Sequence, residues 1–320
     1  METLLAINHL RTYFYQSNAV IPAVDDVSFT INKGETLCMV GESGCGKSVT
    51  AFSIIRLLPM PPARFVSGEI LFQGEDLLKK TNKQMCAIRG NQISFIYQEP
   101  MTSLNPVFTI GMQLSETLRI HKNMNAKEAR DYSIHMLELV GIPSAAMRMD
   151  EYPHQLSGGM RQRVMIALGL CCDPELLIAD EPTTALDVTI QAQILDLMQN
   201  LKQKLGMTML FITHDLGVVA EIAQRVIVMY AGKIVEEGAT ATIFAQPRHP
   251  YTKGLMKCIP RVEGAKKEVL PTIKGVVPPP DQFPAGCRFH PRCPLAADVC
   301  RSVVPEMRPV GQSHVACHLA

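Results

Sequence analysis

One stretch constrains this chain more than any other: the apolar run Thr36–Val40 continues directly into Gly41-Glu42-Ser43-Gly44-Cys45-Gly46-Lys47-Ser48. The apolar run predicts a buried strand, and the glycines let successive backbone N–H groups turn inward around an anion. Lys47 can neutralise the β- and γ-phosphates of a nucleotide, and the Ser48 hydroxyl can bind Mg²⁺. The helix that follows, from Val49 onwards, adds the positive end of its dipole. The pattern is a Walker A phosphate loop and predicts binding of a nucleoside triphosphate.

A second glycine pair opens a helical pattern further along the chain, in Leu156–Gln162. Ser157 is expected to cap this helix, and Gly158 and Gly159 leave backbone N–H groups bare for an anion. No lysine accompanies them, and one nucleotide needs one phosphate loop. We therefore expect this helix end to contact the γ-phosphate held by another subunit, so that ATP joins a dimer. The alternative is an ordinary capped helix with a glycine kink.

Two carboxylates, Asp180 and Glu181, end a second predicted buried strand at Leu176–Ala179. In open α/β sheets ligands collect beyond the carboxyl ends of the strands, where the phosphate loop is also expected. Asp180 is then placed to hold Mg²⁺ through its waters. Glu181, on the opposite side of the pleat, is placed to polarise an attacking water. The alternative is a charged cap between strand and loop.

Taken in order, these segments resemble the ATPases of ABC transporters. In that family the motif that matches residues 157–159 acts on the ATP of the partner subunit. Pro182–Asp187 resembles the D-loop of the family, with Thr184 where serine is common. The resemblance implies that Asp187 reaches across the dimer interface.

Two polar residues acquire a role from the same resemblance. His214 follows the predicted strand Met207–Thr213 and matches the switch histidine, which contacts the γ-phosphate and positions water. Gln98 ends the predicted strand Ile93–Tyr97 and matches the Q-loop glutamine, which senses Mg²⁺ and touches the membrane partner. These roles are inferred only because each residue directly follows a predicted strand.

An aromatic residue near position 14 is expected to stack on adenine. By alignment with the family we favour Phe14. Tyr13 and Tyr15 flank it, and strand alternation places both on the other face.

Cys45 stands in the phosphate loop where relatives often have serine. Its place near a helix N-terminus and Lys47 should favour its thiolate, and we expect alkylation of Cys45 to block ATP binding sterically. The alternative is that only the backbone matters there and any small side chain suffices.

Composition narrows the class of partner. The chain has 320 residues, 47% of them hydrophobic, and a formal net charge of +1. Near neutrality argues against a nucleic-acid clamp, because phosphate backbones are bound mainly through an excess of Lys and Arg. The start, Met1–Leu5, lacks the pattern of a signal peptide, and no segment approaches the ~20 apolar residues that span a bilayer. We expect a cytosolic protein that sits at the cytoplasmic face of the membrane only through partners.

The fold class expected is α/β: a P-loop NTPase core (RecA-like) with a helical signature subdomain, a small antiparallel β part and a Cys-rich C-terminal extension. The nucleotide-binding domain is predicted over residues 1–255, with the helical subdomain at about 96–160, and the extension over 256–320. The amphipathic stretch Ser133–Val140 has two uses open to it, docking a partner helix or internal packing.

Four of the ten cysteines form a cluster near the end of the extension: Cys287, Cys293, Cys300 and Cys317. A cytosolic chain is not expected to pair them as disulfides. Four thiolates suit a four-iron, four-sulfur cluster or a tetrahedral zinc site, and the absence of a Cys-x-x-Cys pair weakens the zinc pattern. Free thiols are the third alternative. Substitute ligands are available at His290, His314 and His318.

Gly286–Pro294 and Pro247–Thr252 resemble the extension of oligopeptide and dipeptide importer ATPases, some of which carry a four-iron, four-sulfur cluster. The resemblance then covers the whole chain and indicates the D-type ATPase subunit of such an importer. It implies two transmembrane permease subunits, a sister ATPase or second copy as dimer partner, and an extracytoplasmic solute-binding protein. Peptides and metal chelates such as nickel complexes are compatible substrates.

Three other classes are weighed against this one. A soluble ABC ATPase acting on DNA or ribosomes usually has tandem or coiled-coil-interrupted domains, which this chain lacks. An exporter ATPase should not need the cysteine extension. A non-enzymatic iron–sulfur sensor conflicts with the intact Glu181 and His214.

Overall fold

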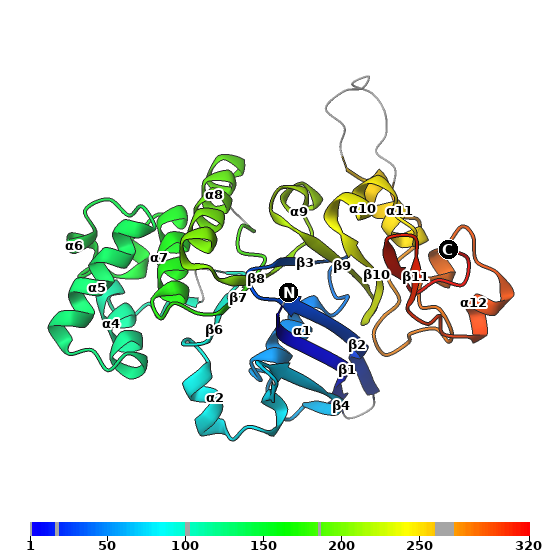
Figure 1. Ribbon diagram of the computed structural model, residues 1–320, viewed down its shortest axis with the longest axis horizontal. Coiled ribbons are helices and arrows are strands. Elements are labelled where there is room, and N and C mark those ends of the chain that lie inside the picture. The colour runs from blue at the N-terminus through cyan, green and yellow to red at the C-terminus, as the bar shows by residue number, and fades with distance from the viewer. Residues whose placement is uncertain (1, 17–18, 100–102, 185–186, 260–271) are drawn as a thin grey trace. The chain divides into compact units, whose positions relative to one another are not determined.

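The computed structural model describes residues 2–16, 19–99, 103–184, 187–259 and 272–320 (Figure 1). The chain forms two compact units. The first unit contains residues 1–2, 32–35 and 79–211, and the second contains residues 3–31, 36–78 and 212–320. The border between them crosses strand β8 (Thr208–Thr213), so neither unit is continuous in sequence.

The second unit contains an antiparallel sheet with the strand order β2-β1-β4-β5. Leu5 pairs with Phe72 and Phe14 with Ala63 across β1 and β4. Alternate side chains of β1, such as Leu5 and Ile7, are fully buried, as a sheet with one core-facing side requires. The strands are β1 (Thr3–Gln16), β2 (Ala19–Asn32), β4 (Ala63–Phe72) and β5 (Glu75–Asp76).

The remaining strands of the second unit follow the order β11-β12-β10-β9-β3. They are β3 (Thr36–Val40), β9 (Arg225–Tyr230), β10 (Lys233–Ala239), β11 (Arg308–Val310) and β12 (Ser313–Val315). Strand β3 runs parallel to β9, whereas β10 runs antiparallel to β9 and to β12. All five residues of β3 are buried, because a parallel strand is covered on both faces. The helices of the second unit are α1 (Lys47–Ile54), α9 (Leu216–Ile222), α10 (Thr240–Ala245), α11 (Pro250–Lys257) and α12 (Asp298–Ser302).

The first unit contains the strand order β8-β7-β6, to which β8 contributes Thr208–Phe211. Strands β6 (Ile93–Ile96) and β7 (Leu176–Asp180) are parallel, with Ile93 opposite Leu176. The helices of the first unit are α2 (Asn82–Ile88), α4 (Ile110–His121), α5 (Ala126–Leu139), α6 (Ala145–Arg148), α7 (Gly158–Leu170) and α8 (Val188–Leu205).

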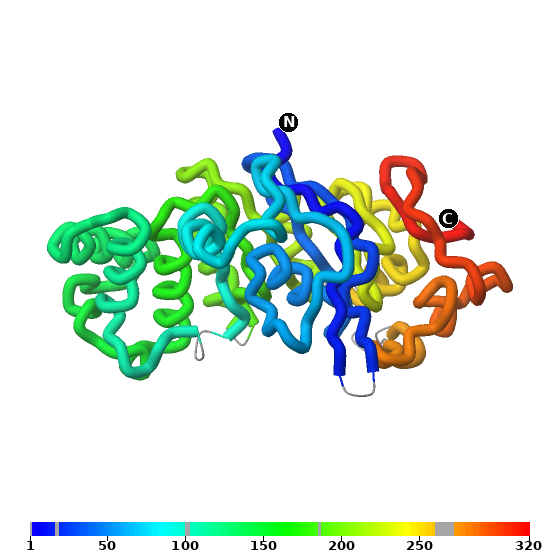
Figure 2. Tube along the Cα trace, turned by 90° about the horizontal axis from the view of Figure 1, so that it is seen from below, coloured from blue at the N-terminus to red at the C-terminus, as the bar shows by residue number. Residues whose placement is uncertain are grey.

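Helices α4 to α7 gather in one cluster of the first unit, as Figures 1 and 2 show. Side chains at helical spacing, Ile110, Leu114 and Leu118, bury one face of α4. A capping box at Asn125, with Glu128 three residues later, starts α5. Local chemistry therefore sets where these helices begin, and their apolar faces hold them together.

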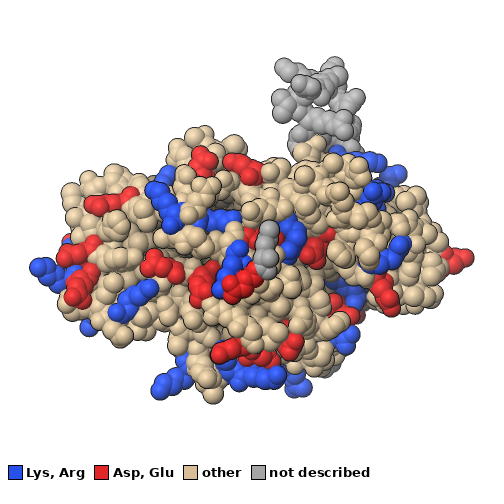
Figure 3. Space-filling model, in the orientation of Figure 1, with Lys and Arg blue, Asp and Glu red and all other residues tan. Residues whose placement is uncertain are grey.

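The α/β fold with an antiparallel β part is confirmed, whereas the domain boundaries at 255 and at about 96–160 stay predictions. The stretch Ser133–Val140 lies mostly in α5, and its Ser133, Met136 and Leu137 are buried, which favours internal packing. None of the described helices is long and apolar enough to cross a membrane. Lys and Arg mix with Asp and Glu over the face shown in Figure 3.

Candidate nucleotide site

The phosphate loop lies in the second unit, between the end of β3 at Val40 and the start of α1 at Lys47. Gly46 has φ +103°, and a Cβ on it would lie 2.4 Å from the Ala23 carbonyl oxygen. Only glycine fits this left-handed and crowded position. Ser43 and Gly44 are exposed at the turn of the loop, and Ser48 is half-buried in the first turn of α1.

Lys47 folds back over the loop. Its Nζ donates to the carbonyl oxygen of Gly41 at 2.8 Å and to that of Glu42 at 3.2 Å, and the residue is 6% exposed. The ammonium group is thereby held at the loop itself, where a phosphate would bring its negative charge. Backbone, lysine and helix N-terminus together fit a nucleoside triphosphate.

The expectation that Cys45 is a reactive thiolate is wrong in this structure. Cys45 is 1% exposed, and burial raises the pKa of its thiol, an effect that the charge of Lys47 only partly offsets. Desolvation outweighs the nearby positive charge because the thiol faces protein rather than solvent. Alkylation of Cys45 in the folded chain is therefore disfavoured.

The three aromatics near position 14 differ in what they contact. The hydroxyl of Tyr13 donates to Asp25 at 2.8 Å, and burial followed by this carboxylate raises the pKa of Tyr13 to about 12. The ring of Tyr15 lies under the guanidinium of Arg64 at 4.8 Å. With both tyrosines engaged, Phe14 stays the predicted adenine contact.

His214 follows β8 directly, as predicted, and its side chain is exposed; its contact with the γ-phosphate stays a prediction. The next residue, Asp215, caps α9 by accepting from the backbone N–H of Gly217 at 2.8 Å. The turn that holds His214 is thus fixed on its C-terminal side.

The first unit holds the carboxylates. Asp180 is buried at the end of β7, and Glu181 follows with φ +46°. The expected alternation of the two side chains across a pleat is wrong, because a left-handed residue leaves the strand path. The carboxylate of Glu181 accepts hydrogen bonds at one oxygen, Oε2, from Gln98 Nε2 at 3.1 Å and from Thr184 Oγ1 at 3.0 Å. The structure thus brings Gln98 to Glu181, a contact the sequence did not predict.

The second glycine pair starts α7 as predicted, with the Ser157 side chain accepting from the backbone N–H of Met160 at 3.3 Å. A Cβ on Gly158 would meet nothing within 4 Å, whereas one on Gly159 would lie 3.3 Å from Ile190. The Gly158 side of this helix end is therefore open.

The D-loop is described only in part, since Ala185 and Leu186 lie outside the described residues. Asp187 caps α8 in its own chain by accepting from the backbone N–H of Ile190 at 2.9 Å. Its role across a dimer interface stays a prediction.

The phosphate loop also contacts the C-terminal extension, which no sequence motif predicted. Arg292 pairs with the Glu42 carboxylate, and the hydroxyl of Tyr251 accepts from the backbone N–H of Glu42 at 2.9 Å. One signal was present in the sequence: an acidic side chain in a loop that binds anions calls for a cation nearby.

Two cysteines of the late cluster in the extension, Cys287 and Cys293, are affected by burial and by their neighbouring thiols. Burial, and then the neighbouring thiols, raise the pKa of Cys287 to about 11 and raise that of Cys293. Among the described residues, however, no group of three or more His, Cys, Asp or Glu side chains is placed to hold a metal ion. The described geometry therefore gives no support of its own to the predicted cluster or zinc ion, which stays a prediction.

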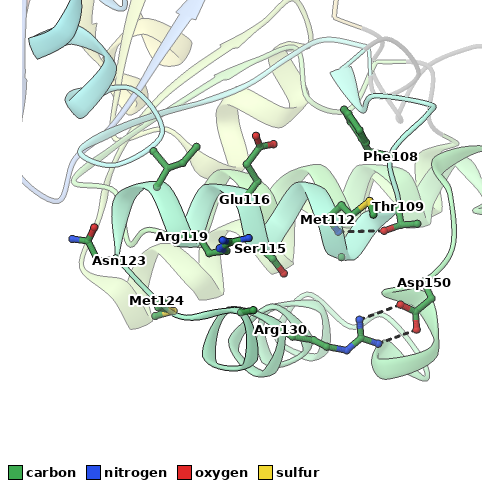
Figure 4. Close-up of a pocket in the computed structure, with 13 residues that line it drawn as sticks. Phe108, Thr109, Met112, Ser115, Glu116, Arg119, Asn123, Met124, Arg130 and Asp150 are labelled. Atoms are coloured by element: carbon green, nitrogen blue, oxygen red, sulfur yellow. Dashed lines mark hydrogen bonds and ion pairs between the residues drawn. The ribbon is translucent and has the colours of Figure 1, made fainter.

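A surface cavity of about 940 Å³ lies beside α4 in the first unit (Figure 4). The ion pair between Arg130 and Asp150, at 2.9 Å, lies at one side of it. Met112 and Ile120 of α4 line it and are 61% and 64% exposed. Exposed apolar side chains of this region therefore lie on α4 and on Phe108 just before it, outside the Ser133–Val140 stretch.

The chain combines a phosphate loop after a buried strand, a second strand that leads into Asp180-Glu181, and a capped helix that begins with two glycines. Together these features define an ATP-binding cassette, which is a class of ATPase. Residues 24–184 match the family "ABC transporter", and residues 235–300 match "Oligopeptide/dipeptide transporter, C-terminal region". The chain belongs to the ATP-binding proteins of ABC transporters, in the oligopeptide/dipeptide group.

Two curated relatives are similar over almost their whole length. The oligopeptide transport ATP-binding protein AppD of Bacillus subtilis is 55% identical over 96% of this chain and 93% of its own. The dipeptide transport ATP-binding protein DppD of the same organism is 52% identical over 98% and 93%.

Solved structures agree with the fold. The ATP-binding cassette MJ0796, a dimer in a post-hydrolysis state bound to ADP and Pi, has a TM-score of 0.66 and 26% identity over 74% of this chain and 98% of its own. The protein cbiO1 of Clostridium perfringens, part of the cbiONQ transporter complex, has a TM-score of 0.65 and 26% identity over 77% and 92%.

Proposed function

We propose that this chain is the ATP-hydrolysing subunit of an importer for peptides. The observation that carries the proposal is the combination, in one chain, of the cassette motifs with the C-terminal region matched over residues 235–300. The AppD and DppD relatives, named for oligopeptide and dipeptide transport, support the choice of substrate. An importer of metal chelates or nickel is the alternative within this family, and a soluble ABC ATPase is the weaker one.

Each site residue has a proposed role. Lys47 and the loop N–H groups hold the phosphates, and Phe14 stacks on adenine. Glu181 accepts a proton from the attacking water, and His214 completes the contacts of the γ-phosphate. Mg²⁺, when bound, offsets charge on the phosphates, and its proposed ligands are Ser48, Gln98 and Asp180.

Dimerisation is the proposed source of force. The exposed end of α7 at residues 157–159 would grip the γ-phosphate bound to the partner subunit, with Asp187 at the same interface. Hydrolysis removes the phosphate that links the subunits, so transport becomes a population shift between closed and open dimers. The dimeric state of MJ0796 supports this arrangement.

The proposed complex contains a sister ATPase or a second copy of this chain, two permeases and an extracytoplasmic solute-binding protein. The chain would then lie at the cytoplasmic face of the cell membrane as a peripheral subunit. No nucleic-acid partner is proposed, because the net charge is only +1.

ATP hydrolysis by the chain alone, compared with the chain assembled with its sister ATPase and permeases in lipid, tests this function. We expect the rate to rise on assembly and to rise again when the solute-binding protein is loaded with peptide. Equal rates alone and assembled would point to a soluble ATPase. Stimulation by a nickel chelate but not by peptide would favour the alternative importer.

A metal group at Cys287, Cys293, Cys300 and Cys317 stays a prediction from the sequence and the resemblance, and no catalytic step is assigned to it. Anaerobic purification followed by an absorbance scan and by iron, sulfide and zinc assays decides it. Stoichiometric iron and sulfide would support the cluster, zinc alone would support the alternative, and the absence of all three would leave free thiols.

A further inference from the structure

Arg292 of the C-terminal extension forms a two-point ion pair with the phosphate loop. Its Nη1 lies 2.6 Å from Glu42 Oε2, and its Nη2 lies 3.0 Å from Glu42 Oε1. The Arg292 side chain is 4% exposed and that of Glu42 is 28% exposed. A bidentate pair that is largely shielded from solvent is directional and is screened less than a surface pair.

The remaining donors of Arg292 are fixed as well. Its Nε donates to the carbonyl oxygen of Lys274 at 3.1 Å, and Nη2 donates to that of Ile273 at 3.4 Å. The hydroxyl of Tyr230 lies 3.4 Å from Nη1. The guanidinium is therefore oriented before any ligand arrives, and it does not depend on Glu42 alone for its position.

The same segment is anchored a second time, four residues earlier. Arg288 pairs with Asp25 of β2 and donates to the carbonyl oxygen of Ala231 at 2.5 Å. Lys233 lies 3.2 Å from the same carboxylate of Asp25. With Arg288 held in this way, Arg292 is presented to the phosphate loop by a segment that is itself tied to the second unit.

The carboxylate of Glu42 would repel a bound nucleotide if Arg292 did not neutralise it. Glu42 follows Gly41 in the phosphate loop, where a nucleotide brings several negative charges, and an unpaired carboxylate there would repel them. Arg292 neutralises the carboxylate and turns it toward the extension, while Tyr251 holds the backbone N–H of the same residue. The loop is thus fixed at its first acidic residue from two sides.

We propose that Arg292 is a positioning residue of the ATP site: it neutralises Glu42 and holds the phosphate loop in the form that binds ATP. The C-terminal extension then forms part of the nucleotide site rather than a separate appendage. This inference rests on the placement of ATP at the phosphate loop proposed above.

Equilibrium titration of the full chain with a fluorescent ATP analogue tests the inference. Arg292→Met, which keeps length but removes charge, should weaken binding about tenfold, as expected for a lost contact to a charged group. Arg292→Lys keeps the charge but loses the two-point geometry. Its affinity for the ATP analogue should lie between that of Arg292→Met and that of the unaltered chain. Raising the salt from about 0.1 M to about 1 M should shrink the defect, because screening weakens the repulsion from Glu42.

The decisive variant is the double change Arg292→Met with Glu42→Gln. Removing the carboxylate removes the repulsion, so the double variant should bind ATP more tightly than Arg292→Met alone. A role in packing only would give no such rescue, and a thermal melt of each variant separates folding losses from binding losses. Arg301→Met is the matched control, because Arg301 lies in the same extension with a side chain that is 70% exposed.

Two outcomes would overturn the inference: an Arg292→Met chain that binds ATP as the unaltered chain does, or a double variant as weak as the single one. Lys47→Ala separates this failure from failure of the site. If Lys47→Ala loses ATP binding while Arg292→Met binds ATP normally, only the role of Arg292 is refuted, and the placement of ATP stands. Normal binding in Lys47→Ala would refute the placement of ATP itself.

Discussion

Gln98 donates a hydrogen bond to the carboxylate of Glu181, although the two residues are 83 positions apart in the sequence. The hydroxyl of Thr184, three residues after Glu181, donates to the same oxygen. Two donors on one oxygen restrict how the carboxylate can rotate. The proposed base is thus positioned by its own unit before nucleotide binds.

Replacing Glu181 by Gln should lower the rate of ATP hydrolysis by about 100-fold or more, because the amide cannot accept the proton of the attacking water. ATP binding should persist, since the change does not touch the phosphate loop. Phosphate release measures the rate, and analogue titration measures binding. Glu138→Gln, at an exposed position of α5, is the control, and full hydrolysis by the Glu181 variant would remove Glu181 as the base.

Thr184→Val keeps the shape of the side chain and removes the hydroxyl that donates to Glu181. We expect kcat to fall about tenfold, the range for one hydrogen bond to a charged group, with little change in KM for ATP. Steady-state kinetics measure both constants. Thr184→Ser keeps the donor and should stay close to the unaltered chain; a large loss in that variant would contradict the hydrogen-bond explanation.

Gly158→Ala separates contacts within the chain from contacts with a partner. A Cβ at Gly158 meets nothing within 4 Å, and alanine favours a helix over glycine by up to about 1 kcal/mol. The isolated variant should therefore fold and bind ATP at least as well as the unaltered chain.

The assembled Gly158→Ala variant should nevertheless lose hydrolysis, by about tenfold or more, because the new methyl group would face the nucleotide of the partner subunit. Comparing melting temperature and ATP binding with the hydrolysis rate of the assembly checks this. An assembly that hydrolyses ATP at the normal rate would argue for an ordinary capped helix.

His249 makes stability depend on acid. It is 1% exposed, and burial, with a smaller effect of Lys253, lowers its pKa to about 3. The unfolded chain binds a proton near pH 6.5 and the folded chain does not. The contribution of His249 to the free energy of unfolding is therefore complete above about pH 6.5. It is lost as the pH falls toward 3, by about 1.4 kcal/mol per pH unit.

His249→Asn tests this dependence, because asparagine can still cap α11, where the His249 ring accepts from the backbone N–H of Tyr251. Urea unfolding at pH 7 and pH 5 gives the free energy of unfolding at each pH. We expect a smaller loss between the two values in the variant than in the unaltered chain. Equal losses would show that other groups carry the acid sensitivity.

Local patterns were sufficient for the phosphate loop, β7 with its terminal Asp180, and the start of α7 at Ser157, because strand, loop and cap are decided within a few residues. They failed where distant atoms decide. The thiol of Cys45 follows its burial rather than the neighbouring Lys47. Glu181 leaves the strand alternation because its φ is positive.

The contact between Glu42 and Arg292 could not be predicted from either local segment. The two residues are 250 positions apart, and the pair depends on the packing of the extension against β9 and α11, where the ring of Phe289 contacts Tyr230 and Tyr251. Charge alone indicated that Glu42 needs a cation. It did not indicate which of the 31 Lys and Arg residues supplies it.

The shielding of Cys45 also makes the chain convenient to label. Cys86 on α2 is exposed, whereas the thiol of the phosphate loop is closed to reagents in the folded state. A maleimide dye applied briefly under native conditions would attach first at Cys86 and leave the nucleotide loop unmodified. The molecule thus carries its own attachment point for following its motions optically while it turns over ATP.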